Sequence, residues 1–210
     1  MNIFKTLGHY IYLAQWFVRA RLFGRKAPLQ TVLFISDICN LRCKHCNVYE
    51  LKNPHNMTYE QVRDHLQYSY DQGSRFVDFE GGEVTIWKDG DKRINDLIAL
   101  AKEIGFFSCT ITTNAQLPFA GSRADSIWVS LDGAGSYHEE VRGKGTFAKL
   151  EKNIAECGHK HLSVNMVVNT LNYTDVFNTI EYAKNNPFFI KNNTFLYTFI
   201  FLFNITFYCP

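Results

Sequence analysis

The chain has 210 residues, a formal net charge of +2 and 46% hydrophobic residues. This composition excludes an intrinsically disordered chain and a strongly basic nucleic-acid-binding protein, and it fits one globular, core-forming domain. Three of the six cysteines lie within eight residues and the others lie singly in apolar surroundings, which excludes the disulfide framework of a small secreted protein and favours a reducing, cytoplasmic compartment.

Residues 1–30 are predicted to form a basic amphipathic helix. No acidic residue occurs before Asp37, and apolar residues recur at roughly helical spacing. His9 and Gln15 interrupt the apolar run well before it could span a bilayer, and the cleavage site of a secretory signal is missing. Two interpretations stay open, a helix packed on the outside of the domain and a peripheral contact with anionic lipid. The basic residues are Lys5, Arg19, Arg21, Arg25 and Lys26.

From residue 31 onward, short apolar runs alternate with helical patterns, which is typical of repeated βα units and a parallel sheet. Thr58 is predicted to cap the first helix of this series in a capping box with Gln61, and Gly73 is predicted to end it. The next helix is predicted to carry an apolar face from Ile94 and to end at Gly105. The first three strands are predicted over residues 31–36, 75–80 and 106–113.

The second half of the pattern continues in the same way, and Cys157 is predicted to lie in the core on the apolar face of its helix. Five βα units are predicted over residues 31–187, so a sixth strand is due near residue 189. The predicted elements are a strand over 126–131, a helix that ends before Gly158, an alternating strand over 162–169 and a helix from Thr174 to Asn185 before Pro187.

Residues 188–210 depart from this pattern. Their composition changes to Phe, Asn, Thr, Ile, Tyr and Leu, and Lys191 is the only charged residue. A membrane-inserting segment would need a longer apolar run without Asn204, and a buried strand pair would need a turn signal. We favour a third hypothesis, that this aromatic tail is non-native sequence produced by loss of the reading frame or by truncation.

The motif Cys39-Asn40-Leu41-Arg42-Cys43-Lys44-His45-Cys46 offers three thiolates on one short loop. Iron–sulfur clusters are held by cysteine thiolates, and a [4Fe-4S] cubane ordinarily takes four. Three thiolates would leave the fourth iron open to a small molecule with an amine and a carboxylate. Two alternatives remain, simple packing on one face of a helix and a zinc site completed by His45 or a remote residue, although no second cysteine or histidine pair at suitable spacing follows downstream.

Two motifs together resemble the radical S-adenosylmethionine superfamily. They are the Cys-x3-Cys-x2-Cys loop after the first predicted strand and Gly81-Gly82-Glu83 after the second. The resemblance covers about residues 31–187 and is nearest to the branch with the molybdenum-cofactor cyclase and the SPASM-type peptide-modifying enzymes. It implies an α/β fold, a partial (β/α)6 TIM-like barrel cut short before strand six. Further matching segments are Thr112-Thr113-Asn114, Ser130-Leu131-Asp132-Gly133 and Asn165.

The resemblance also implies roles for individual residues. Cys39, Cys43 and Cys46 would hold a [4Fe-4S] cluster. The other implied cofactor is S-adenosylmethionine. Its methionine amino group would meet Gly81, Gly82 and Glu83, and its ribose or carboxylate would lie near Ser130 and Asp132. Its carboxylate would pair with Arg142, and Asn114 and Asn165 would also contact the cofactor. From the residues alone, Gly81-Gly82 and Asp132-Gly133 could be plain turns, Asn114 a helix cap and Arg142 a solvated surface residue.

The implied activity is that of a radical S-adenosylmethionine enzyme. The cluster would cleave the cofactor reductively to methionine and a 5′-deoxyadenosyl radical, which abstracts hydrogen from an unknown substrate, a peptide or a small molecule. A ferredoxin or flavodoxin is the implied electron donor, and no nucleic-acid partner is expected. Two alternative functions are a truncated, inactive fragment of such an enzyme and a zinc- or membrane-associated binding module.

Overall fold

The computed structural model describes residues 3–24 and 27–189. Of the predicted aromatic tail, only Phe188 and Phe189 belong to this part, and both pack against the hydrophobic core. The hypothesis that the tail is non-native therefore lies almost wholly outside the described residues.

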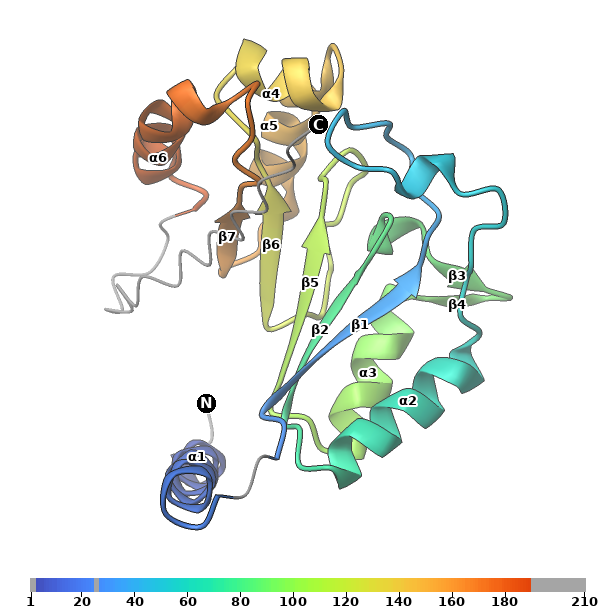
Figure 1. Ribbon diagram of the computed structural model, residues 1–210, viewed down its shortest axis with the longest axis vertical. Coiled ribbons are helices and arrows are strands. Elements are labelled where there is room, and N and C mark those ends of the chain that lie inside the picture. Colours follow the sequence, from blue (N-terminus) through green and yellow to red (C-terminus); the bar gives the residue numbers. More distant parts are fainter. Residues whose placement is uncertain (1–2, 25–26, 190–210) are drawn as a thin grey trace.

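A parallel sheet of five strands forms the centre of the fold (Figure 1). From the second strand onward, each strand of this sheet pairs in parallel with the sheet strand that precedes it in the chain. This order is the one that repeated βα units give when each strand is added beside the last. The structure thus confirms the predicted partial barrel. Its strands, in spatial order, are β1 (Gln30–Ser36), β2 (Phe76–Gly81), β5 (Ser108–Thr113), β6 (Ser126–Ser130) and β7 (Leu162–Asn165).

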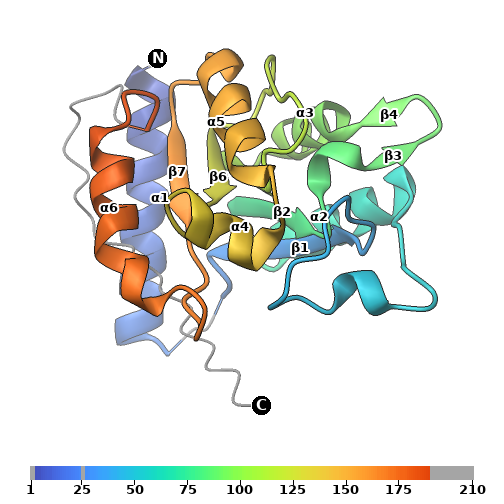
Figure 2. The same ribbon diagram turned by 90° about the horizontal axis from the view of Figure 1, so that it is seen from above.

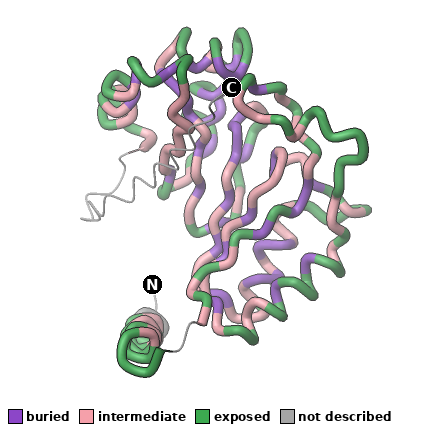
Figure 3. Tube along the Cα trace, viewed as in Figure 1, coloured by how far each residue is buried: buried purple, intermediate pink, exposed green. Residues whose placement is uncertain are grey.

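Helices follow most of the strands. In Figure 1, α2 and α3 lie side by side against one face of the sheet, and α4, α5 and α6 lie near β6 and β7. Figure 3 shows buried residues concentrated in the strands and on the inward sides of the helices. The helices are α1 (Ile3–Leu22), α2 (Tyr59–Asp71), α3 (Ile94–Ile104), α4 (Ser136–Arg142), α5 (Thr146–Cys157) and α6 (Val176–Asn185).

Local signals place the helix ends where the sequence predicts them. The capping box of α2 is present, since Gln61 donates its amide to Thr58 Oγ1 and accepts the amide of Thr58. Helices α3 and α5 both end at a glycine in the left-handed conformation, Gly105 and Gly158. Cys157 is 8% exposed and belongs to the core, as predicted.

Strand alternation divides the sheet into two faces. Val77, Phe79, Ile111 and Ile127 point into the core between the sheet and the helices. The intervening side chains of β2, β5 and β6 lie on the opposite face and are half-buried. That face carries mainly polar groups, which are Asp78, Glu80, Thr110, Thr112, Ser126 and Ser130.

Two predicted strands are longer than the observed ones by two residues or more. The third begins at Ser108, because the Phe106 amide donates to Ala101 O and so belongs to the end of α3. The fifth ends at Asn165, because the Val167 amide donates to the Asp132 carboxylate instead of a strand. In each case the backbone amide bonds to another partner instead of to a neighbouring strand.

The count of five βα units is wrong in one place. The connection from β5 to β6, residues 114–125, contains no helix. It is short, and Pro118 and Gly121 interrupt any helical pattern. The last predicted helix also begins later, at Val176, after a 3₁₀ turn over Tyr173–Asp175. A small hairpin of β3 (Lys88–Asp89) and β4 (Lys92–Arg93), turning at Gly90, was not predicted.

Helix α1 lies at one side of the domain (Figure 1, Figure 2) and contacts it through three aromatic side chains. Tyr12 donates its hydroxyl to Gly73 O, Trp16 donates its indole N–H to Ala27 O at 2.9 Å, and the ring of His9 stacks on Phe107. No helix within the described ranges is long and apolar enough to cross a membrane. Several apolar side chains of α1 stay exposed, among them Tyr10, Phe17 and Leu22.

Candidate functional site: the cysteine loop and the strand ends around it

The three clustered cysteines lie on the loop over residues 37–57, which leaves the carboxyl end of β1 and leads to α2 (Figure 1). The loop closes on itself at its base. The Asp37 amide donates to His55 O at 2.8 Å, the His55 amide donates to the Asp37 carboxylate, and the Met57 amide donates to Ile35 O. The carboxyl ends of parallel strands are where βα folds place their ligand sites.

The three thiols are close enough to affect one another. Cys43 is buried, whereas Cys39 and Cys46 are half-buried. Burial raises the pKa of Cys43 to about 11, the positive charge of Arg142 opposes this shift, and negative charge on Cys39 or Cys46 adds to it. Burial likewise raises the pKa of Cys39. A metal centre that withdraws charge from the sulfurs would favour the thiolate forms that this environment otherwise disfavours.

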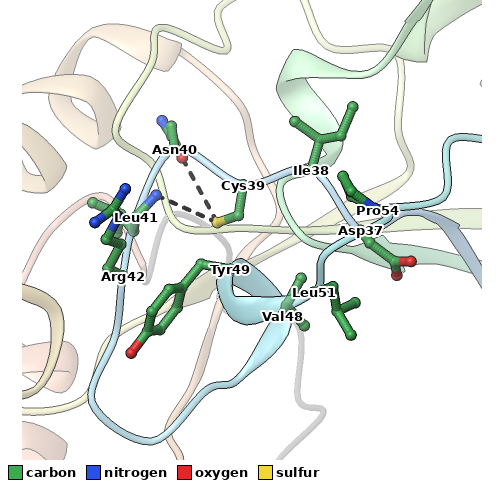
Figure 4. A pocket seen from close by; sticks show the side chains of 10 residues that line it. All are labelled: Asp37, Ile38, Cys39, Asn40, Leu41, Arg42, Val48, Tyr49, Leu51 and Pro54. Atoms are coloured by element: carbon green, nitrogen blue, oxygen red, sulfur yellow. Dashed lines mark hydrogen bonds between the residues drawn. The ribbon is translucent and has the colours of Figure 1, made fainter.

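A cavity of about 370 Å³ opens within the loop beside Cys39 (Figure 4). The Cys39 sulfur accepts the Leu41 amide at 3.5 Å and lies 4.0 Å from Asn40 Oδ1. Tyr49, on the 3₁₀ turn Val48–Glu50, forms part of the opposite wall. The full lining is Asp37, Ile38, Cys39, Asn40, Leu41, Arg42, Val48, Tyr49, Leu51 and Pro54.

Gly81 and Gly82 bring the end of β2 against the start of the cysteine loop. A Cβ at Gly81 would lie 2.3 Å from Ser36 O, and one at Gly82 would lie 2.3 Å from Ile38 O. The Gly82 amide donates to Ser36 O at 2.6 Å and the Glu83 amide to Ile38 O at 2.9 Å. The glycines therefore permit a close approach of backbone to backbone. Their contact with a cofactor stays a prediction.

The Glu83 carboxylate is 1% exposed and joins the ends of β2 and β5. Its Oε1 accepts the Thr85 amide at 3.0 Å and the hydroxyls of Thr85 and Thr113 at 2.6 and 2.7 Å. Its Oε2 accepts the Asn114 amide at 2.7 Å. Four donors thus satisfy a carboxylate for which the sequence suggested an ammonium partner.

Asn114 reaches from the end of β5 to the cysteine loop. Its Nδ2 donates to Asn40 Oδ1 at 2.8 Å and lies 3.8 Å from the Cys39 sulfur. Its Oδ1 accepts the Gln116 amide, so the residue forms a local turn and caps no helix. Asn40, which the sequence did not single out, is thereby the partner that ties this side of the loop to the sheet.

Asp132 and Arg142 form a buried ion pair on the other side of the loop. Arg142 Nε donates to Asp132 Oδ2 at 2.6 Å, and Arg142 Nη1 donates to the Cys43 sulfur at 3.9 Å. Burial acts to lower the pKa of Arg142, but Asp132 and Cys43 outweigh it and the pKa is raised. The solvated-surface alternative for Arg142 is wrong, since its side chain is 9% exposed.

Helix α4 holds the loop through its backbone as well. The Lys44 amide donates to Val141 O at 2.9 Å, and the Lys44 ammonium pairs with the Glu140 carboxylate at the surface. The short helix was not predicted, because Gly135 and Gly143 enclose a segment of only seven residues. It nevertheless carries two side chains, Glu140 and Arg142, and one carbonyl that contact the cysteine motif.

Three further residues fix Asp132 and were missed by sequence reasoning. The Val167 amide donates to Asp132 Oδ1 at 2.9 Å, Asn172 Nδ2 donates to Asp132 O at 2.8 Å, and His138 Nδ1 accepts the Asp132 amide at 3.3 Å. Burial lowers the pKa of His138 to about 4, so its ring is neutral and can accept there. No local motif marks these partners: Val167 and Asn172 come from a distant segment, and His138 lies on the unpredicted helix α4, six residues after Asp132.

Ser130 and Asn165 end neighbouring strands, β6 and β7, and are paired in register. The Leu131 amide donates to Asn165 O at 2.9 Å. Both side chains are half-buried on the polar face of the sheet, on the side away from the core. The structure thus places Ser130 and Asn165 at the carboxyl ends of their strands, at the same end of the sheet as Glu83, Asn114 and Asp132.

The donor set fits a cluster better than a single ion. In the part of the chain that the structure describes, no three His, Cys, Asp or Glu side chains are arranged to hold one metal ion. A [4Fe-4S] cubane takes one thiolate on each of several irons, so its ligands need not converge on a point. Three free, mutually interacting thiols on one anchored loop match that requirement.

An open parallel βα sheet with a three-cysteine loop at the end of its first strand defines a class of partial-barrel protein with its ligand site at the strand ends. The chain belongs to the radical SAM superfamily, whose family model matches residues 33–183. Members of this superfamily are enzymes, and membership implies a [4Fe-4S] cluster and S-adenosylmethionine as cofactors.

Two curated relatives support this membership. The chain is 25% identical over 171 residues to the sporulation killing factor maturation protein SkfB of Bacillus subtilis, covering 78% of this chain and 41% of the relative. It is 27% identical over 170 residues to the GTP 3′,8-cyclase of Actinobacillus succinogenes, covering 74% and 50%. The chain therefore spans about half the length of these relatives or less.

Solved structures agree on the fold. Streptococcus suis SuiB bound to S-adenosylmethionine superposes with a TM-score of 0.60 at 24% identity, over 74% of this chain and 38% of SuiB. The complex of SuiB with the precursor peptide SuiA gives the same TM-score over 87% of this chain and 42% of SuiB. Methylornithine synthase gives a TM-score of 0.58 at 18% identity, covering 83% and 54%.

Proposed function

We propose that this chain is the cofactor-binding part of a radical S-adenosylmethionine enzyme. The observation that carries the proposal is the cysteine loop itself, with three free thiols at the end of β1, held by Asn114 on one side and by α4 on the other. When bound, a [4Fe-4S] cluster supplies the electron that cleaves S-adenosylmethionine reductively to methionine and a 5′-deoxyadenosyl radical. Cys39, Cys43 and Cys46 are its proposed ligands.

The protein's part is to position the cofactors and limit their access to water. The backbone of Gly81 and Gly82 lies directly against the start of the cysteine loop, so a ligand at that loop meets the end of β2. Ser130 and Asn165 present polar side chains at the ends of the next strands. These residues, together with Glu83, Asn114, Asp132 and Arg142, are the proposed surroundings of S-adenosylmethionine.

A peptide is the proposed substrate class. SuiB was solved with a precursor peptide, and SkfB is named a maturation protein of a killing factor. The GTP 3′,8-cyclase, whose name gives a nucleotide substrate, keeps a small molecule as the second candidate. A ferredoxin or flavodoxin is the proposed electron donor and the cytoplasm the proposed compartment. Contact of α1 with anionic lipid stays a prediction from its basic residues and exposed apolar side chains.

The first experiment is reconstitution of the full chain with iron and sulfide under anaerobic conditions. We expect bound iron and sulfide in cluster proportion and the broad visible absorption of an iron–sulfur cluster. Changing any of Cys39, Cys43 or Cys46 to Ala should abolish both signals. Cys109→Ala and Cys157→Ala are the matched controls, because both thiols lie in the core, away from the loop. They should retain the cluster.

The second experiment mixes the reconstituted protein with S-adenosylmethionine and a strong reductant and assays 5′-deoxyadenosine and methionine. Formation of both would support the proposed reaction. A stable cluster without either product would instead support the inactive-fragment alternative. Zinc in place of iron and sulfide in protein purified anaerobically would contradict the cluster assignment.

A further inference from the structure

The guanidinium of Arg142 contacts two different partners at the same time. Its Nε donates to the Asp132 carboxylate at 2.6 Å and its Nη1 donates to the Cys43 sulfur at 3.9 Å. Both charged side chains are almost completely buried, with 9% of Arg142 and none of Asp132 exposed. A planar guanidinium can serve two acceptors in this way, whereas an ammonium is a single compact charge.

We propose that Arg142 is a positioning residue that holds the Cys43 sulfur through an N–H···S hydrogen bond and raises the reduction potential of the cluster on this loop, while Asp132 limits that increase. The inference rests on the proposed function. Reduction adds negative charge to a cluster and its sulfurs, so a nearby donor and positive charge stabilise the reduced form. A neighbouring carboxylate acts in the opposite direction.

Burial makes these two groups effective. Charges interact more strongly in the low-dielectric interior than at the surface, where solvent and salt screen them. Lys44, which precedes His45 and Cys46 in the motif, illustrates the contrast, because its side chain is 56% exposed and pairs with Glu140 in solvent. Among the cations near the loop in the described part of the chain, Arg142 is the one that is both buried and bonded to a cysteine sulfur.

Asp132 is held firmly enough to set the position of Arg142. Its Oδ1 accepts the Val167 amide, which leaves Oδ2 for Arg142. Its backbone is fixed by His138 and by Asn172, as described above. The ring of His45 lies on the same side, with Nδ1 3.8 Å from Oδ2. The pair therefore joins the end of β6 and helix α4 to the middle cysteine of the motif.

The test is the midpoint potential of the reconstituted cluster, measured by a redox titration followed by electron paramagnetic resonance in the absence of S-adenosylmethionine. Arg142→Lys keeps a positive charge for Asp132 but loses the second arm, so we expect a more negative midpoint. Asp132→Asn keeps the N–H···S bond and removes the opposing charge, so we expect a more positive midpoint. The double variant Asp132→Asn/Arg142→Gln leaves no unpaired buried charge and removes the N–H···S bond, so its midpoint should be more negative than that of the wild type.

Lys152→Gln is the control for loss of one positive charge, because Lys152 lies exposed on α5 and should leave the midpoint unchanged. If Arg142→Lys does not fold, the inference is tested by the other two variants, because Asp132→Asn and the double variant should shift the midpoint in opposite directions. Midpoints that equal the wild-type value in all three would overturn the inference while the cluster itself still supports the proposed function. Wild-type protein that binds no iron and sulfide would overturn both. An unchanged midpoint with weaker S-adenosylmethionine binding in Arg142→Lys would assign Arg142 to the cofactor carboxylate instead.

Discussion

Nδ2 of Asn114 donates a hydrogen bond to Oδ1 of Asn40 at 2.8 Å, across 74 positions of sequence. The bond ties the cysteine loop to the end of β5, and the same Nδ2 lies 3.8 Å from the Cys39 sulfur. Asn114 is 4% exposed whereas Asn40 is exposed, so loss of the bond would leave the buried amide of Asn114 without this partner. The position of Cys39 therefore depends on a residue that follows a different strand.

A double-mutant cycle tests this bond. We expect Asn40→Ala and Asn114→Ala each to lower the free energy of unfolding by about 1–2 kcal/mol, with a coupling of about 1 kcal/mol between them. Urea unfolding of the wild type, the two single variants and the double variant measures the two losses and the coupling between them. Asn95→Ala, which removes contacts to Gly121 and Arg123 elsewhere in the fold, should combine additively with Asn40→Ala. Simple additivity of the Asn40 and Asn114 variants would show that the bond contributes nothing.

Glu83→Gln is expected to destabilise the fold. The buried carboxylate accepts four hydrogen bonds. The side-chain NH2 group of Gln is itself a donor, so it cannot accept the hydrogen bonds that one carboxylate oxygen accepts now. We expect a loss of about 2–3 kcal/mol in the free energy of unfolding. Glu80→Gln is the matched control, because Glu80 contacts only the Thr112 hydroxyl, at 3.4 Å, among the hydrogen bonds of the described chain. Equal losses in the two variants would argue against Glu83 as the link between β2 and β5.

Gly82→Ala is expected to displace the cysteine loop from β2. The new methyl group would meet backbone, Ile38 O at 2.3 Å, so no flexible side chain can move aside. We expect a loss of about 2–3 kcal/mol in the free energy of unfolding. Gly8→Ala has open space around it within α1 and should stabilise the protein by up to about 1 kcal/mol. Circular dichroism during urea unfolding compares the two, and a tolerated Gly82→Ala would mean that the loop can shift freely.

The elements of this fold that the sequence predicts well are those coded by neighbours. The capping box at Thr58, the glycine stops at Gly105 and Gly158, and the alternation of β2 and β5 all depend on residues within one element. The spacing of Cys39, Cys43 and Cys46 belongs to the same kind, because one short loop carries the whole motif. Local chemistry was sufficient for each of these predictions.

The contacts that the sequence could not predict join distant segments. Asn40 stands inside the cysteine motif, but its partner Asn114 lies 74 positions further along the chain. Likewise, the Asp132 carboxylate accepts the Val167 amide, 35 positions away, which only the folded chain brings near. The sequence singles out Glu83 as a candidate site residue, but two of the four donors to its carboxylate come from Thr113 and Asn114 at the end of β5, which composition cannot reveal. The sequence therefore predicts a candidate site at the strand ends and leaves its internal hydrogen bonds open.

Asp78 lies on the polar face of β2, and its buried Oδ1 has no hydrogen-bond partner in the described structure. Burial, with a smaller contribution from the charge of Glu80, raises the pKa of Asp78 from its usual 3.8 to about 7. Between these two values the folded chain binds more protons than the unfolded chain. Stability contributed by Asp78 is therefore present at low pH and is lost as the pH rises through about 7.

We expect Asp78→Asn to remove this loss and to make the protein more stable than wild type at about pH 8. A difference of about three pKa units corresponds to about 4 kcal/mol, and partial exposure of the side chain reduces the expected gain to about 1–2 kcal/mol. Urea unfolding of both proteins from about pH 5 to about pH 8 measures it. His138, whose pKa is lowered to about 4, contributes an opposite slope at acid pH, so the difference between the two proteins isolates Asp78. Asp64→Asn, at an exposed position of α2, should follow the wild-type profile, and the assignment fails if Asp78→Asn does so too.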